Sequence, residues 1–181
     1  EMVKVLMISQ ENYRYRELRT KLEDMISLLG GMETFVRRGD RVLIKPNLLS
    51  ASDPEKRITT DPAVVKAVAS MVLDSGGKPF IGDSPALEPF SRVTRITGME
   101  EVGKELGIPV EELTDPQQVQ TDDSYRFRNI EISSKVLNAD SVINIPKLKT
   151  HCQMLLTLGV KNLFGTVVAQ RKAEWPSRVG L

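Results

Sequence analysis

Residues 141–165, "SVINIPKLKTHCQMLLTLGVKNLFG", contain the only histidine and the only cysteine of the chain, His151 and Cys152. Lys147, Lys149 and His151 alternate here, so an extended backbone would place their side chains on one side. Ammonium and imidazole groups gathered in this way could bind a phosphate or a carboxylate. Neighbouring cations also lower one another's pKa, which suits a lysine or His151 to proton transfer near neutral pH. The alternative is a solvated loop whose histidine is hydrogen-bonded within the protein.

The stretch "GVKNLFG" adds Lys161 and Asn162 to an otherwise apolar background. Polar side chains framed by apolar ones need hydrogen-bond partners, either in the core or in a ligand. We therefore treat Lys161 and Asn162 as candidate ligand-binding residues. Cys152 is predicted to be buried and unreactive, because adjacent residues of a strand face opposite sides.

A second candidate group follows the apolar run "VLIK", where Lys45 precedes Pro46 and Asn47. An ammonium group at the end of a buried strand is costly unless it is paired with an anion. Lys45 is therefore a candidate for proton transfer, or else a strand-end lysine whose tip reaches water. Asn47 would orient a ligand through its amide, or would simply belong to a turn.

The third group is "GDSP", which follows another apolar run and contributes Asp83 and Ser84. Asp83 could orient a proton-transfer group or contact a metal, and Ser84 could contact a ligand. Ser84 before Pro85 is equally typical of the start of a helix. Neither phosphate-binding fingerprint, G-x-x-x-x-G-K-[ST] or G-x-G-x-x-G, occurs in the chain. The spacing of histidine, cysteine and acidic residues predicts no zinc site, and we assign no metal ligands.

The elements that must position these groups follow from the apolar patterning. Continuous apolar runs predict strands at 2–8, 40–47, 78–82, 125–132 and 141–146. Helical periodicity predicts helices within 15–31, 59–77 and 91–107, and a further helix beginning near 154. Thr60 or Asp61 would cap the second helix, with Pro62 in its first turn.

This alternation predicts a single α/β domain over residues 1–181, with a mainly parallel sheet and helices on both faces in three layers. Ligands of such sheets bind beyond the carboxyl ends of the strands. The loops after 41–46, 78–82 and 141–146 would then meet on one rim. We expect the three groups of polar residues to form one site there.

Composition narrows the classes of function. The chain has 25 Lys and Arg against 24 Asp and Glu, and 5% aromatic residues, which argues against nucleic-acid binding. No apolar run approaches the length that crosses a bilayer, so we expect no membrane partner and a cytoplasmic protein. One cysteine excludes an intramolecular disulfide and any thiolate cluster built from this chain alone.

Four segments together, "VLIKPNL", "TTDPAVVKAVASMVLDSGG", "GDSP" and "INIPKLKTHCQMLLTLGVKNLFG", resemble the family catalogued as domain of unknown function 362, from about Val42 to Trp175. Many members of that family carry a bacterial-type ferredoxin module. The resemblance implies an α/β domain and a link to iron–sulfur redox chemistry, but no established reaction. The residues that match recurrent polar positions of the family are Lys45, Asn47, Asp83, Lys147, Lys149, His151, Lys161 and Asn162.

Two departures from the family pattern stand out. The pattern continues beyond this chain with a further acidic and glycine-rich segment, and a histidine usual after the tryptophan is replaced by Pro176. We therefore expect the chain to be a fragment of a longer family domain. An iron–sulfur cluster, implied only by the resemblance, would lie on a missing part or on a ferredoxin partner and not on this chain.

These observations leave two hypotheses open. The first is an enzyme, redox-linked through its family, that acts on a small phosphate- or carboxylate-bearing substrate. Lys147 and Lys149 would hold the anion, and His151 or Lys45 would move a proton. The second is a non-catalytic module that binds an anionic cofactor or scaffolds an iron–sulfur partner. Loss of turnover with retained binding in His151→Ala would distinguish them.

Overall fold

The central sheet determines how the chain is organised. The computed structural model describes residues 4–85, 88–120, 129–151 and 155–167. Within these ranges four parallel strands pair in the order β3-β2-β1-β6. The strands are β1 (Arg41–Pro46), β2 (Lys78–Asp83), β3 (Val110–Glu112) and β6 (Ser141–Ile145). The strands predicted near 40–47, 78–82 and 141–146 are thus confirmed.

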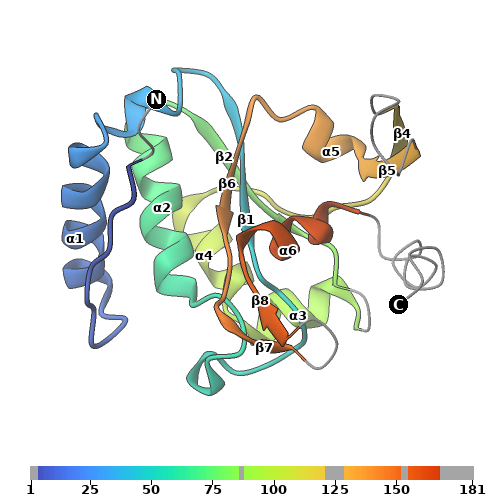
Figure 1. Ribbon diagram of the computed structural model, residues 1–181, viewed down its shortest axis with the longest axis horizontal. Coiled ribbons are helices and arrows are strands. Elements are labelled where there is room, and N and C mark those ends of the chain that lie inside the picture. The colour runs from blue at the N-terminus through green and yellow to red at the C-terminus, as the bar shows by residue number, and fades with distance from the viewer. Residues whose placement is uncertain (1–3, 86–87, 121–128, 152–154, 168–181) are drawn as a thin grey trace.

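Helices cover both faces of this sheet, which confirms the three-layer α/β class. In Figure 1, α2 (Pro62–Asp74) and α4 (Met99–Leu106) lie on one side of the strands, with α1 (Tyr15–Leu28) packed outside α2. The short helices α5 (Ser134–Leu137) and α6 (Gly159–Asn162) lie on the other side. Single 3-10 turns occur at Met32–Thr34, Pro54–Lys56 and Leu163–Thr166 (η1, η2 and η3).

Local chemistry explains the bounds of α2. The Asp61 carboxylate accepts a hydrogen bond from the Ala63 amide, and Pro62 occupies the first helical position. Gly76 ends the helix with a φ of 79°, a conformation that favours glycine. Asp61, and not Thr60, is therefore the cap, which leaves the Thr60 hydroxyl free to bond elsewhere.

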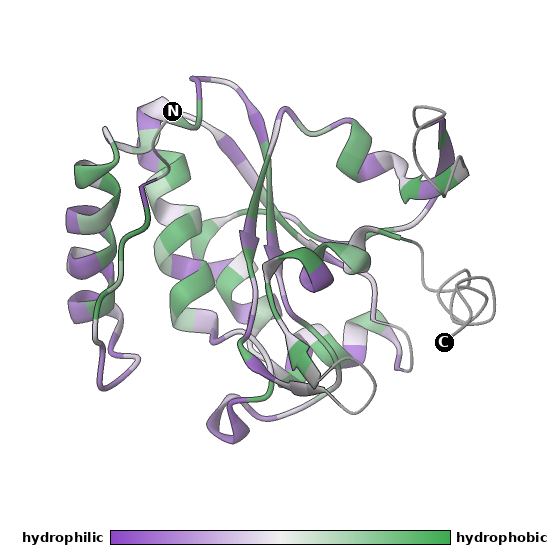
Figure 2. Cartoon of the chain, in the orientation of Figure 1, coloured by the Kyte–Doolittle hydropathy of each residue, from purple (hydrophilic) through white to green (hydrophobic). Residues whose placement is uncertain are grey.

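The faces of β1 separate two apolar clusters. Val42 and Ile44 belong to the large cluster under α2, whereas Leu43 packs with Phe80 and Leu113 on the opposite face. Because side chains alternate along a strand, Lys45 shares the face of Leu43. The two sides of α1 also differ: Figure 2 shows hydrophilic residues on its outward side and hydrophobic residues on the side toward α2.

The strand predicted at 2–8 is wrong over its described part. Residues 4–10 form no strand, and the Val5 and Met7 side chains are 78% and 92% exposed. The segment runs along α1, where the Lys21 Nζ donates to the Ser9 carbonyl at 2.8 Å. An apolar run becomes a strand only beside a partner strand, and the described sheet has none at this place.

A predicted helix and a predicted strand also differ from the observed elements. The helix predicted at 91–107 is divided into α3 (Phe90–Ile96) and α4 by Gly98, whose φ is 79°. The strand predicted at 125–132 is β5 (Asn129–Ser133), which pairs antiparallel with β4 (Pro116–Gln120) outside the main sheet. Residues 121–128 lie outside the described ranges.

The helix predicted from 154 begins later. Residues Leu155–Thr157 form β8, which pairs antiparallel with β7 (Lys149–His151), and α6 starts at Gly159. Thr157 and the leucines before it pair with the preceding strand across a hairpin, and this pairing overrides the helical pattern. None of the described helices is long and apolar enough to cross a membrane.

Candidate functional site

The order of the strands reverses direction between β1 and β6. In the sheet, β2 and then β3 lie on one side of β1, whereas β6 lies on the other side of β1. The helices that follow β1 and β6, α2 and α6, lie on opposite faces of the sheet (Figure 1). Such a reversal separates the loops beyond the carboxyl ends of the two strands, where ligands of open α/β sheets bind. Asn47 follows β1 at this point, and β7 follows β6.

Lys45 and Asp83 form a buried ion pair at this edge. The Lys45 Nζ lies 2.7 Å from the Asp83 Oδ1 and donates to the Pro46 carbonyl, also at 2.7 Å. Lys45 is fully buried and Asp83 is 4% exposed. Burial lowers the pKa of Lys45, and the Asp83 charge opposes that effect. Neither side chain extends to water, which corrects the alternative of a strand-end lysine that reaches solvent.

The Asp83 carboxylate also organises two loops. Its Oδ2 accepts from the Leu48 amide and its Oδ1 from the Ser84 amide, each at 2.8 Å. Ser84 is buried and lies in a coil rather than at a helix start, because α3 begins at Phe90. The loops after β1 and β2 are therefore tied to one carboxylate.

Gly165, in η3, lies directly over this ion pair. A Cβ added at Gly165 would collide with the Asp83 Oδ1 and approach the Lys45 Nζ to 2.6 Å. Only glycine lets the η3 backbone come this close, so the segment after α6 closes over the pair.

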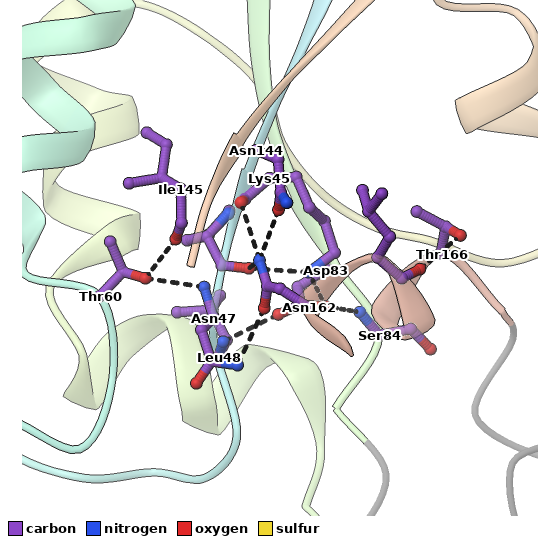
Figure 3. A network of polar contacts seen from close by, with 12 residues as sticks. Lys45, Asn47, Leu48, Thr60, Asp83, Ser84, Asn144, Ile145, Asn162 and Thr166 are labelled. Carbon is purple, nitrogen blue, oxygen red and sulfur yellow. Dashed lines mark hydrogen bonds and ion pairs between the residues drawn. The ribbon is translucent and has the colours of Figure 1, made fainter. Parts of the chain in front are cut away.

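Asn162 connects α6 to the sheet. Its Nδ2 donates to the Asn144 Oδ1 at 2.8 Å and lies within 3.2–3.3 Å of the Pro46 and Lys45 carbonyls. Its Oδ1 accepts from the Asn47 Nδ2 at 2.9 Å (Figure 3). This buried amide thus satisfies the carboxyl end of β1 and holds α6 against it.

Two residues that sequence reasoning missed complete the network in Figure 3. The Asn144 Nδ2 donates to the Gly159 carbonyl, and Asn144 lies opposite Lys45 in the register of β6 and β1. The Thr60 hydroxyl accepts from the Asn47 amide and donates to the Ile145 carbonyl, at 2.8 and 2.7 Å. An asparagine inside the apolar run "VINI" was the signal for Asn144. Thr60 gave none beyond its possible use as a cap.

Lys149 approaches the same network from the solvent side. Its half-buried Nζ donates to the Asn47 Oδ1 at 2.7 Å and to the Ile58 carbonyl at 2.8 Å. Its pKa is lowered to about 8, first by burial and then by the charge of Lys161, with a smaller contribution from Lys147. Asp83 acts in the opposite direction.

The remaining candidate residues of the sequence analysis do not all lie in the same network. Lys147 precedes β7 and contacts Tyr13, with its Nζ 3.2 Å from the phenol oxygen, so it does not share the partners of Lys149. Lys161 is half-buried on α6 and affects Lys149 through its charge. The backbone of His151 belongs to β7, which confirms the extended segment there, but its side chain and all of Cys152 lie outside the described residues.

Three further observations concern metal ligands, cluster ligands and surface hollows. The described residues contain no group of three or more histidine, cysteine, aspartate or glutamate side chains suited to a metal. One cysteine in the chain does not fit an iron–sulfur cluster, which needs several thiolates. Two surface hollows lie against α1, one lined in part by Arg19, Glu23 and Asp74 and the other by Ser9, Lys21 and Leu28.

Comparison with known proteins gives two findings. A family model described as "Domain of unknown function (DUF362)" matches residues 42–180. The "Thylakoid-associated protein sll1697" of Synechocystis sp. (strain ATCC 27184 / PCC 6803 / Kazusa) is 42% identical over 180 residues, which are 99% of this chain and 56% of that protein. The chain thus spans just over half the length of this relative.

Proposed function

Since this chain belongs to the domain of unknown function 362 family, we propose that it binds a small phosphate- or carboxylate-bearing ligand beyond the carboxyl ends of β1 and β6. The family description names no reaction, so the proposal depends on the site. In its full form, the proposal is that this chain is an enzyme domain that acts on such a ligand. A link to redox chemistry is implied by the family resemblance alone.

The observation that carries the proposal is a group of unpaired ammonium groups. Lys147, Lys149 and Lys161 influence the same edge, and no described carboxylate forms an ion pair with any of them. Lys149 is held by two neutral oxygens, of Asn47 and Ile58. Asp83 and Asp61 act on Lys149 and Lys147 through their charge, without forming an ion pair with them. The three ammonium groups still raise one another's free energy, and a bound anion would lower that cost.

Each network residue has a role in this proposal. Lys149 and Lys161 supply the charge that attracts the anion, and Lys147 contributes from the rim. Asn47 orients Lys149, while Asn162 and the Lys45–Asp83 pair hold the loops in place. The complete burial of Lys45 favours a structural role over proton transfer, and His151 stays the candidate for moving a proton.

A second candidate is a non-catalytic module that scaffolds an iron–sulfur partner or holds an anionic cofactor. It is favoured by exposed apolar side chains near the same edge. Val160 is 87% exposed on α6 and Leu148 66% exposed before β7; Leu156, Leu158, Leu163 and Phe164 are 40–50% exposed. Any cluster would belong to the partner, since this chain lacks the thiolates.

Location is a separate proposal. The name of the cyanobacterial relative associates that protein with thylakoids, whereas a cytoplasmic location was expected from the sequence. We propose a cytoplasmic protein that meets membranes only through partners. Fractionation of the source cells tests the location, and binding of the purified chain to protein-free lipid vesicles would contradict the dependence on partners.

A thermal-shift screen against inorganic phosphate, small phosphate esters and small carboxylates tests the binding proposal. A ligand at 100 times its dissociation constant stabilises the native state by about 2.7 kcal/mol. We expect a stabilising anion whose effect is lost in Lys149→Met and kept in Lys104→Met, an exposed lysine on α4. Equal shifts in both variants, or no shift with any anion, would contradict an anion site here.

A further inference from the structure

We propose that the side-chain amine of Lys149 is a nucleophile that forms an imine with a small oxo acid, a substrate with a carbonyl group beside its carboxylate. This inference rests on the proposed anion site, because the carboxylate must first be bound near Lys149. It adds a reaction class and a named reacting atom to that site.

The hydrogen bonds of Lys149 are the first argument. A neutral amine has two N–H donors and one lone pair, and Lys149 has two acceptors, the Asn47 Oδ1 and the Ile58 carbonyl. Both are neutral oxygens at 2.7–2.8 Å, so the neutral amine satisfies them fully. The lone pair then remains available for attack on a carbonyl carbon.

The position of these acceptors is itself secured. The amide of Asn47 also donates to the Oδ1 of Asn162, which fixes which end of the Asn47 amide faces Lys149. The backbone N–H of Asn47 donates to the Thr60 hydroxyl, and the Asn47 carbonyl accepts from the Thr60 N–H. A nucleophile held in this way loses little freedom when it reacts.

The charges around Lys149 are the second argument. Lys161 and Lys147 disfavour a third positive charge, and Asp83, which favours it, is already paired with Lys45. A cationic neighbour and partial burial are the two conditions that make a lysine amine nucleophilic near neutral pH. The pKa of about 8 agrees with this arrangement.

The surroundings of the Lys149 stem are the third argument. Thr157 lies directly opposite Lys149 in the β7–β8 pairing, so the two side chains share one face of the hairpin. The hydroxyls of Thr157 and of Thr59, next to Ile58, are sealed from solvent and have no hydrogen-bond partner among the described residues. Thr59 and Thr157 are each 2% exposed, so the residues beside the Lys149 stem and beside Ile58 are buried, and this burial disfavours the charged amine.

The step balances without a further reactant. The Nζ lone pair attacks the carbonyl carbon, the C=O bond becomes a C–OH, and a proton moves from nitrogen to oxygen. Loss of that hydroxyl as water, with a proton from the medium or a nearby acid, leaves a C=N bond to Lys149. Lys161 offers an ammonium group for the carboxylate. Lys45 is unsuited to this chemistry because it is fully buried and ion-paired.

Borohydride trapping with pyruvate or glyoxylate tests the inference. Reduction of the imine leaves a stable adduct that adds the mass of the oxo acid less one oxygen atom. Peptide mapping of the wild-type chain should find this adduct on Lys149 at least about tenfold more than on Lys104, whose pKa is raised by Glu100. Trapping should rise with pH through about 8 and disappear in Lys149→Arg, with Lys104→Met as the matched control.

The outcomes separate the two proposals. If pyruvate stabilises the wild-type chain in a thermal-shift assay but no adduct forms on Lys149, the imine is overturned and the anion site stands. Adducts spread evenly over exposed lysines also overturn it. If neither pyruvate nor phosphate binds, the anion site fails as well. Lys161→Gln adds a second readout, because loss of its charge should move the trapping midpoint to higher pH.

Discussion

The ammonium group of Lys45 lies 2.7 Å from the Asp83 carboxylate, on a neighbouring parallel strand, in a place that solvent does not reach. The pair joins the carboxyl ends of β1 and β2 exactly where two loops begin, and Gly165 closes over it. These contacts fix the starts of both loops at the same edge that Lys149 reaches through Asn47.

Removal of one partner of this pair should be strongly destabilising. Lys45→Met leaves a buried carboxylate, and Asp83→Asn leaves a buried ammonium group, each at a cost of about 3–5 kcal/mol. The double variant leaves no unpaired charge and should lose much less than the sum. Urea unfolding measures all three. Additive losses would mean that the two charges are not coupled.

Gly165→Ala should destabilise the fold by about 1–3 kcal/mol, because the new methyl group collides with Asp83 and Lys45. Gly159→Ala is the matched control in the same region. Its Cβ would meet only the Asn144 Nδ2, at an ordinary 3.7 Å. Denaturant unfolding of the two variants compares them, and equal losses would contradict the close packing of η3 on the ion pair.

Asn162→Asp should destabilise the fold in a pH-dependent way. The new carboxylate oxygen would face three acceptors, the carbonyls of Lys45 and Pro46 and the Asn144 Oδ1. The folded state therefore raises the pKa of this carboxyl above its unfolded value. Its protonated form is the one that fits, so stability relative to wild type is highest at low pH and is lost as pH rises through the folded pKa.

At neutral pH we expect a loss of about 3 kcal/mol from the repulsion and the lost donor. Asn162→Ala serves as the control, because it removes the same bonds without adding a titratable group. Unfolding curves should be measured from pH 4 to 8. The difference in unfolding free energy between Asn162→Asp and wild type should become smaller only at the acid end. A pH-independent gap would show that the amide donor does not face these acceptors.

Thr60→Val should cost about 1–3 kcal/mol, since it leaves the half-buried backbone N–H of Asn47 without its acceptor. The hydroxyl links this amide to the Ile145 carbonyl, so it ties the end of β1 to the end of β6. Thr60→Ser keeps the hydroxyl and should retain most of the stability. Thermal unfolding compares the two variants, and an unchanged stability in Thr60→Val, or a larger loss in Thr60→Ser than in Thr60→Val, would contradict this role of the hydroxyl.

Lys149 should make the native state more stable as pH rises above about 8. Its folded pKa lies below the ordinary value of 10.5, so between these values the unfolded chain binds the additional proton. Stability then increases with pH across this window, and the penalty is fully present below it. Lys149→Met should lack this increase. A wild-type profile that runs parallel to the variant from pH 7 to 10 would refute the lowered pKa.

How much of this could be read from the sequence differs between elements. The start of α2 was predictable, because Asp61 and Pro62 act on backbone atoms within a few residues. Strands β1, β2 and β6 were predictable because continuous apolar runs between helices are typical of a buried parallel sheet. The Ser141–Ile145 strand and the polar residues beyond it were found for the same reason.

The local pattern failed where the presence or absence of a partner strand, or a single glycine, decides the outcome. Residues 4–8 are apolar enough for a strand, but none of the described strands lies beside them. Leu155–Thr157 pair with Lys149–His151 instead of continuing into a helix. Gly98 divides one predicted helix in two, an effect that the periodicity of the surrounding residues conceals.

From the sequence alone came the α/β class, the family, and the suspicion that Lys45, Asp83 and the lysines after β6 share a rim. Only the tertiary structure decided that Lys45 and Asp83 pair with each other, that Asn144 and Thr60 belong to the network, and that Lys147 and Lys149 have different partners. The physical reason is the strand order. It places β6 beside β1, about a hundred residues away in the chain, and contacts at that separation leave no periodic signal in the sequence.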